Sequence, residues 1–177
     1  DRSYLKMKSL FNSPRKLLFP LLLVLLLGFL AYTLASKPTA PNISFTTLDG
    51  KTSSMQDLRG KVVLVNFWAT DCPGCIAEMP ALIQTWHQYH ERGFEVVAIA
   101  MPYDPIDQVK NYTAKNSLPF KVTHDDSGDM SMQFNEVRVT PTTFVLDKDG
   151  KIIRKAIGEL DFKSLHELLD QQLGTKG

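Results

Sequence analysis

The sequence is poor in cysteine, in net charge and in regularly spaced histidine, and each of these shortages excludes a class of function. Its 177 residues carry a formal net charge of +1, without a basic stripe or an RNA-reading motif, so we expect no nucleic-acid partner. The four histidines lack the mutual spacing of metal ligands, and we interpret them as surface or satisfied residues. We therefore predict neither a metal site nor a cofactor.

The two cysteines that are present form a Cys72-Pro73-Gly74-Cys75 motif. It follows a β-rich run, Lys61 to Trp68, and precedes a helical pattern that starts near Pro73. At a strand-to-helix junction both sulfurs lie within disulfide distance, and the helix N-terminus favours the thiolate of the first. This predicts redox chemistry. The alternatives are a passive structural disulfide or half of a zinc site, although zinc needs about four ligands.

A second feature is an almost wholly apolar run from Leu17 to Ala35. At about 1.5 Å per helical residue, it comes near the ~30 Å thickness of a bilayer core. Basic residues precede the run and none lies within it: Lys6, Lys8, Arg15 and Lys16. We predict a transmembrane anchor over 17–35. The alternative is a cleaved signal peptide, because Thr33-Leu34-Ala35 resembles a small-residue cleavage site.

Under either interpretation of the apolar run, the rest of the chain is exported. The positive-inside rule places a short stub, residues 1–16, in the cytoplasm and the later residues across a bacterial inner membrane, on the periplasmic or extracytoplasmic side. Residues 36–41 contain two prolines and are interpreted as a linker, followed by one domain over 42–177. That compartment is oxidising, so a two-cysteine chain there is free to cycle between dithiol and disulfide.

The domain alternates predicted strands and helices, which is typical of an α/β fold with a central mixed sheet flanked by helices. Strands are predicted over 43–47, 61–68, 95–101, 120–123, 142–147 and 151–157. Helices are predicted over 72–90, 105–116, 126–134 and 161–173, with one helical turn at 54–58. Asp104 is a candidate N-cap of the second helix. A turn at Lys148-Asp149-Gly150 joins the last two strands as a hairpin.

Several of these motifs resemble the thioredoxin superfamily, and specifically its TlpA/ResA-like membrane-anchored thiol–disulfide oxidoreductases. The resemblance covers Pro41 to about Leu173. It rests on residues 63–70 leading into the Cys-Pro-Gly-Cys motif, on Ala77-Glu78-Met79-Pro80, and on the strand at 139–144. It implies a thioredoxin-like fold in which residues 102–134 hold an inserted helix and strand.

The resemblance also assigns roles at the site. Cys72 would be the attacking thiolate, and Cys75 the more buried thiol that resolves the mixed disulfide. Pro141 would be cis and lie beside the sulfurs, leaving the backbone of Thr140 to pair with an incoming peptide. Without the resemblance, an ordinary trans proline would be expected at position 141, because cis X–Pro bonds are uncommon.

Three further positions complete the predicted site. Glu78 lies where the TlpA/ResA branch has a glutamate that influences thiol pKa and proton transfer; the alternative is a surface residue favoured by the helix dipole. The buried acid of thioredoxin itself corresponds to Asn66 here, which cannot accept the proton. Asp71 replaces the usual tryptophan before the first cysteine, where it either contacts substrate and disfavours the thiolate or caps the helix. Trp68 is interpreted as a core or rim aromatic and is predicted to border the substrate.

The leading hypothesis is an exported, membrane-tethered enzyme that reduces protein disulfides. The resemblance includes proteins that reduce apocytochrome c during cytochrome c maturation, and reductive work across a membrane requires a membrane-embedded electron donor. A peroxiredoxin-like peroxidase is the first alternative, but Ala69 stands where its motif has threonine. A Sco-like copper chaperone is the second; it would have a wider cysteine spacing and a downstream histidine ligand, and metal titration tests His124 for that role.

Overall fold

The computed structural model describes residues 14–35 and 37–174, and the chain divides into two units, one ending at Lys37 and one beginning at Pro38. The first unit contains one helix, α2 (Pro14–Ala35), which forms in the leucine-rich run as predicted. Its described large apolar side chains, from Leu18 to Leu30, are exposed. Among the described residues, however, no helix reaches the length and apolarity that crossing a membrane requires. The predicted transmembrane span over 17–35 is therefore not confirmed.

A five-stranded mixed sheet forms the centre of the second unit, with the strand order β5-β4-β3-β6-β7. The first three run parallel, and the last two are antiparallel and joined by the predicted hairpin. Their bounds are β3 (Val62–Trp68), β4 (Phe94–Ala100), β5 (Lys121–His124), β6 (Thr142–Leu146) and β7 (Ile152–Ile157). Every residue of β3 and β4 is buried, which explains why both appear as nearly continuous apolar runs in the sequence.

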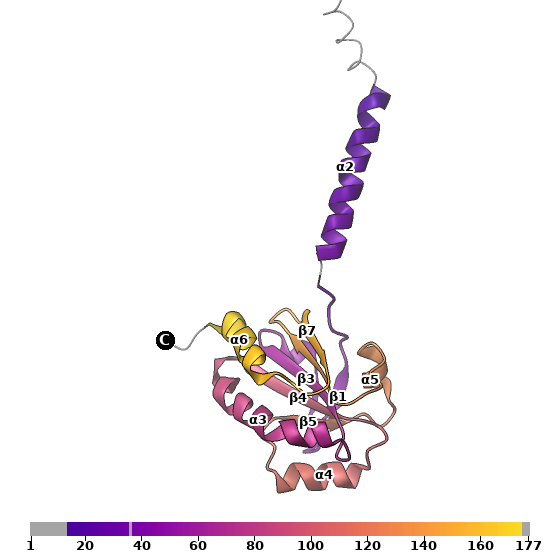
Figure 1. Ribbon diagram of the computed structural model, residues 1–177. Helices are drawn as coiled ribbons and strands as arrows, with labels where there is room; N and C mark the ends of the chain where they lie inside the picture. The colour runs from indigo at the N-terminus through magenta and orange to yellow at the C-terminus, as the bar shows by residue number, and fades with distance from the viewer. Residues whose placement is uncertain (1–13, 36, 175–177) are drawn as a thin grey trace, which may run out of the picture. The chain divides into compact units, whose positions relative to one another are not determined.

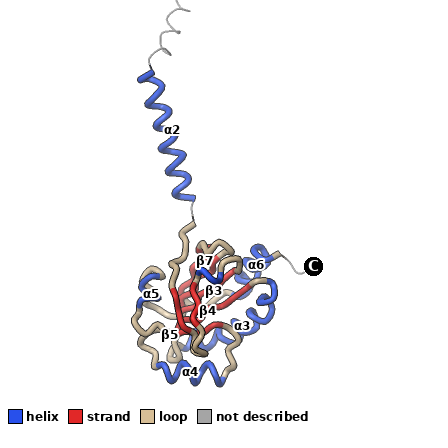
Figure 2. Tube along the Cα trace, turned by 180° about the vertical axis from the view of Figure 1, so that it is seen from behind, coloured by secondary structure: helices blue, strands red, loops and turns tan. Residues whose placement is uncertain are grey.

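Both faces of this sheet are covered (Figures 1 and 2). One face packs against α3 (Pro73–Tyr89) and α6 (Phe162–Leu173), with Val109 of α4 (Ile106–Lys115) at its border. The other packs against the hairpin β1 (Ser44–Thr46)–β2 (Thr52–Ser54), the turn η1 (Gln56–Leu58) and the region of α5 (Asp129–Gln133). A short turn, η2 (His90–Arg92), links α3 to β4. The predicted α/β architecture is thus confirmed.

The segment before β1 differs from its prediction as a linker over 36–41. The amide of Ala40 donates to the carbonyl of Gly150 at 2.9 Å, and the amide of Ile152 donates to the carbonyl of Pro38 at 2.8 Å. Residues 38–40 therefore add to the outer side of β7, because the amide and carbonyl groups there need partners. The short strand β2 was missed, since its three residues are polar and only partly buried.

The opposite edge of the sheet is covered in a similar way by the β1–β2 hairpin. The amide of Leu48 donates to the carbonyl of Val122 at 2.9 Å, and the hydroxyl of Thr123 donates to the carbonyl of Thr46 at 2.8 Å. These bonds join the turn of the hairpin to β5. As a result, the first residues of the domain contact both outer strands of its sheet.

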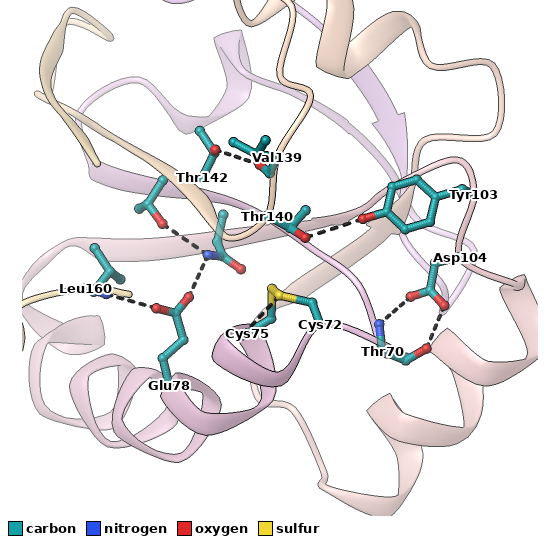
Figure 3. Close-up of a disulfide and its surroundings, with 12 residues drawn as sticks. Thr70, Cys72, Cys75, Glu78, Tyr103, Asp104, Val139, Thr140, Thr142 and Leu160 are labelled. Carbon is teal, nitrogen blue, oxygen red and sulfur yellow. Dashed lines mark hydrogen bonds between the residues drawn. A yellow bond between two sulfur atoms is a disulfide. The ribbon is translucent and has the colours of Figure 1, made fainter. Parts of the chain in front are cut away.

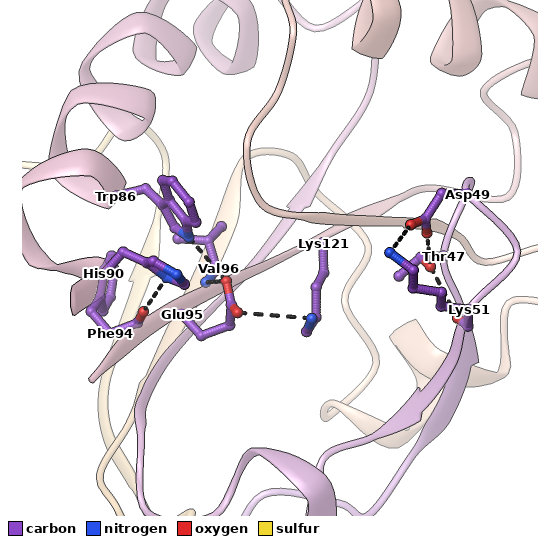
Figure 4. Close-up of polar contacts among 9 residues, drawn as sticks. All are labelled: Thr47, Asp49, Lys51, Trp86, His90, Phe94, Glu95, Val96 and Lys121. Atoms are coloured by element: carbon purple, nitrogen blue, oxygen red, sulfur yellow. Dashed lines mark hydrogen bonds and ion pairs between the residues drawn. The ribbon is translucent and has the colours of Figure 1, made fainter. Parts of the chain in front are cut away.

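A buried carboxylate, Glu95, lies on β4 at the end of the sheet where that strand begins (Figure 4). It accepts hydrogen bonds from the indole Nε1 of Trp86 and from the amide of Val96, each at 3.0 Å. The ammonium of Lys121 lies 3.8 Å from its second oxygen. These partners compensate a charge that would otherwise be costly to bury. They also fix the C-terminal end of α3 to the sheet, and so hold the helix that carries the cysteines.

Candidate active site

The cysteines lie at the N-terminus of α3 and form a disulfide, with their Cα atoms 5.3 Å apart. Cys72 is the N-cap of the helix, and its Sγ accepts a hydrogen bond from the amide of Cys75 at 3.2 Å. The sulfur therefore occupies the capping position, and the alternative in which Asp71 caps the helix is wrong. Cys75 is completely buried, whereas Cys72 is partly exposed. This difference in access agrees with the predicted order of reaction, attack by Cys72 and resolution by Cys75.

The peptide bond between Thr140 and Pro141 is cis, as predicted. This bond lies just before β6, in a loop that borders the disulfide (Figure 3). The carbonyl of Pro141 accepts a hydrogen bond from the amide of Gly158 at 2.9 Å, which fixes the loop to the end of β7. The hydroxyl of Thr140 lies 3.3 Å from that of Tyr103, an exposed residue of the loop after β4. The structure thus brings Tyr103 to the site, which the sequence analysis did not foresee.

Glu78 is buried one helical turn after Cys75 (Figure 3). One carboxylate oxygen accepts a hydrogen bond from Nδ2 of Asn66 at 3.1 Å, and the other accepts from the amide of Leu160 at 3.0 Å. The same Nδ2 of Asn66 donates to the hydroxyl of Thr143, its partner on β6, at 3.0 Å. Glu78 is therefore not the surface residue of the alternative interpretation. It links α3 to β3 and to the segment after β7, and through Asn66 to β6.

The surroundings of Glu78 favour its protonated form. Burial raises the pKa of this carboxyl above its usual value, and the negative charge of Glu159 adds to the effect. The hydrogen bonds from Leu160 and Asn66 act in the opposite direction. Because Asn66 cannot titrate, Glu78 is the member of this pair that can exchange a proton.

Two of the predicted substrate-contacting residues differ sharply in exposure. Trp68 has no exposed surface, and its ring packs against Tyr112 at a centroid distance of 5.3 Å. The prediction that Trp68 contacts substrate is wrong, because the last residue of a strand covered on both faces belongs to the core. Asp71, three residues later, is exposed next to Cys72 and stays a predicted contact.

A second buried carboxylate, Asp104, contacts the loop between β3 and α3. Its two oxygens accept hydrogen bonds from the amide of Thr70 at 2.7 Å and from the hydroxyl of Thr70 at 2.6 Å. The prediction that Asp104 caps α4 is therefore wrong: the N-cap is Pro105, and no side chain caps that terminus. No local pattern indicates this contact, because its partners are 34 residues apart in the sequence.

Three of the described histidines make polar contacts within the domain, and the fourth, His87, is exposed. His166 lies 2.9 Å from the hydroxyl of Thr85, and Nδ1 of His90 lies 3.2 Å from the carbonyl of Phe94. Nε2 of His124 lies 2.7 Å from the carbonyl of Asp104. Within residues 14–35 and 37–174, no group of three potential ligands could hold a metal ion.

Comparison with known proteins agrees with this geometry. The Redoxin family model matches residues 35–169. The chain belongs to the Redoxin family. It is 37% identical over 130 residues to the thiol-disulfide oxidoreductase ResA of Bacillus thuringiensis subsp. konkukian (strain 97-27), covering 73% of this chain and 74% of the relative. Its identity to the thioredoxin-like protein YneN of Bacillus subtilis (strain 168) is 31% over 171 residues, covering 88% and 98% of the two chains.

A solved structure extends the similarity to the fold of this Redoxin family member. The thiol:disulfide interchange protein from Chlorobium tepidum TLS, described as a thioredoxin family protein, has a TM-score of 0.72 and 31% sequence identity. The match covers 79% of this chain and 99% of that one. Together with the Cys72–Cys75 disulfide, these relatives identify a TlpA/ResA-like member of the thioredoxin superfamily. The protein is thus a thiol–disulfide oxidoreductase.

The raised pKa of Glu78 predicts how stability depends on pH. An acid whose pKa is raised by folding contributes stability that is fully present below its unfolded pKa, near 4.5, and is lost as the pH rises through the folded pKa. Stability of the wild type minus that of Glu78→Gln should therefore fall as the pH rises from about 4 upwards. Urea unfolding of both oxidised proteins across this range measures it. A difference that stays constant with pH, or rises, contradicts the argument.

Proposed function

We propose that this oxidoreductase reduces disulfides in exported client proteins, with Cys72 as the attacking thiol. The observation that carries the proposal is the contrast between the partly exposed Cys72 and the fully buried Cys75, beside a cis-proline loop. An incoming disulfide reaches the first sulfur directly, whereas the second is accessible only to Cys72.

The reaction requires two thiol–disulfide exchanges. In the first, the thiolate of Cys72 attacks one sulfur of the client disulfide, a mixed disulfide forms, and the other client sulfur leaves as a thiolate. In the second, the thiolate of Cys75 attacks Cys72, the mixed disulfide breaks, and the second client sulfur leaves. The client disulfide gains two electrons and two protons, and the enzyme ends with the Cys72–Cys75 disulfide.

Glu78 is the candidate proton acceptor for the second exchange. Cys75 must lose its proton inside the core, where an isolated thiolate is disfavoured. Glu78 lies one helical turn away in the same buried region, and burial raises the pKa of its carboxyl, which makes its carboxylate a stronger base than an exposed one. Asn66 holds the carboxylate in place by its hydrogen bond.

The surroundings of the cis-proline fit a polypeptide client. Three large apolar side chains are exposed near this bond: Tyr103 by 57%, Val139 by 53% and Ile157 by 66%. Val139 precedes Thr140, and Ile157 pairs with Thr142 immediately after Pro141. Exposed apolar side chains grouped at one site are typical of a protein-binding surface. The family resemblance suggests apocytochrome c as one such client.

We also propose that the leucine-rich helix tethers the domain to the extracytoplasmic face of a bacterial inner membrane. Its apolar composition, the exposure of its large side chains and the basic residues before it support this proposal. A membrane position would raise the effective concentration of a membrane-embedded dithiol donor. Such a donor is needed because the exported compartment is oxidising.

The assigned roles of the cysteines predict opposite results for two variants. Reduced Cys75→Ser should accumulate a mixed disulfide with an oxidised client such as insulin, because nothing resolves the first exchange. Reduced Cys72→Ser should accumulate little, since Cys75 is buried. Non-reducing electrophoresis with mass spectrometry measures both. Trapping through Cys75 alone would reverse the assignment.

The direction of electron flow predicts a low reduction potential for the Cys72–Cys75 pair. Equilibration with dithiothreitol buffers should give a value near that of thioredoxin, about −270 mV, or lower. A value near that of a strong disulfide donor, about −120 mV, would show that the enzyme oxidises its clients instead.

The tether predicts that the full chain resists extraction from membranes. When expressed in a bacterium, it should stay in the membrane fraction after carbonate washing, because an inserted helix is held almost irreversibly. A matched variant carrying Leu23→Arg and Leu26→Arg should be extracted. Recovery of a soluble domain that begins directly after Ala35 would instead support a cleaved signal peptide.

A further inference from the structure

We propose that Asp104 is a positioning residue for the redox site: it holds the loop that leads to Cys72, and its charge limits the fraction of Cys72 present as thiolate. The inference rests on the proposed role of Cys72 as the attacking thiol. Asp104 lies on the loop between β4 and α4, outside the Cys-Pro-Gly-Cys motif and outside the cis-proline segment.

The contacts of Asp104 are made almost wholly with the active-site loop. Its side chain is buried, with 2% of the residue exposed, yet it has no ion-pair partner among the described residues. Both of its oxygens accept hydrogen bonds from Thr70, one from the amide and one from the hydroxyl. Figure 3 shows this pair beside the disulfide. A buried carboxylate without a cation depends on such donors, so the two groups hold each other in place.

The backbone of Asp104 is fixed from the other side by β5. Nε2 of His124 lies 2.7 Å from the carbonyl of Asp104, and because a carbonyl only accepts, this nitrogen donates. Nδ1 of His124 lies against the carboxylate of Asp126. The side chain of His124 is nearly buried, so its ring is held between these two partners. Asp104 is therefore clamped between β5 and the loop that carries Thr70.

This clamp has two consequences for Cys72. Thr70 is two residues before it, so a fixed Thr70 limits how far the chain can carry the sulfur away from the start of α3. In addition, the carboxylate places a negative charge in a buried position, against the loop that leads to the sulfur. A nearby negative charge disfavours a thiolate, and here it opposes the favourable field of the helix N-terminus.

The test measures the alkylation rate of reduced Cys72 by iodoacetamide as a function of pH, with mass spectrometry to identify the modified cysteine. In Asp104→Asn, which keeps the shape but removes the charge, the pH midpoint should fall and the rate at pH 7 should rise about fivefold. Asp107→Asn is the matched control. It removes an exposed carboxylate three residues away, in the first turn of α4, and should leave the midpoint unchanged.

A second pair of variants tests positioning without changing the charge. Thr70→Val removes the hydroxyl donor and should raise the plateau rate at high pH, because the loop is released, whereas Thr70→Ser keeps the donor and should retain the wild-type plateau. Equal curves for Asp104→Asn and Asp107→Asn, or a wild-type plateau in Thr70→Val, would overturn the inference. If Asp104 had a purely structural role, Asp104→Asn would lower the midpoint of unfolding and leave the alkylation curve of Cys72 unchanged. Modification of Cys75 instead of Cys72 would refute the proposed function itself, and the inference with it.

Discussion

Complete burial of β3 is the constraint on which the rest of the domain depends. All seven of its residues are buried, with helices on one face and the β1–β2 side on the other. The partly exposed Cys72 lies only four residues after Trp68, the buried end of this strand. Polar side chains near this end of the strand are bonded to α3, to β6 and to the loop before α4: Asn66 contacts Glu78 and Thr143, and Thr70 contacts Asp104.

These partners include two buried carboxylates that differ in the groups they face. Glu78 faces an amide side chain and a backbone amide, and burial raises its pKa, which suits a group that exchanges protons. Asp104 accepts hydrogen bonds from the amide and the hydroxyl of Thr70, which suits a group that holds the chain. The loop between the end of β3 and the cysteines is thus flanked by two buried acids, Glu78 on α3 and Asp104 before α4. A third acid, Asp71, precedes Cys72, at the position where the resemblance to the thioredoxin superfamily implies a tryptophan.

The parts of this arrangement that the sequence could predict are those with local patterns. The apolar run of β3, the Cys-Pro-Gly-Cys motif and the turn at Gly150 each indicate their own structure, and the family resemblance supplied the cis bond at Pro141. Pairs that are distant in the sequence had no such signal. Asp104 resembled a helix cap because it precedes a proline and an amphipathic segment, and only the folded sheet brings it to Thr70. Residues 38–40 looked like a linker for a related reason, since their partners come more than a hundred residues later.

The coverage of both sheet edges by residues 38–48 affects how the protein meets unfolded chains. An uncovered outer strand is a template on which any extended polypeptide can add by backbone hydrogen bonds. If the proposed function holds, open edges would let an incompletely folded client add to the sheet away from the disulfide. Here the segment at Pro38 and the hairpin turn at Leu48 occupy part of β7 and of β5. Those backbone groups are therefore already bonded within the domain, which leaves the loop at Pro141 for the client contact that the proposed function requires.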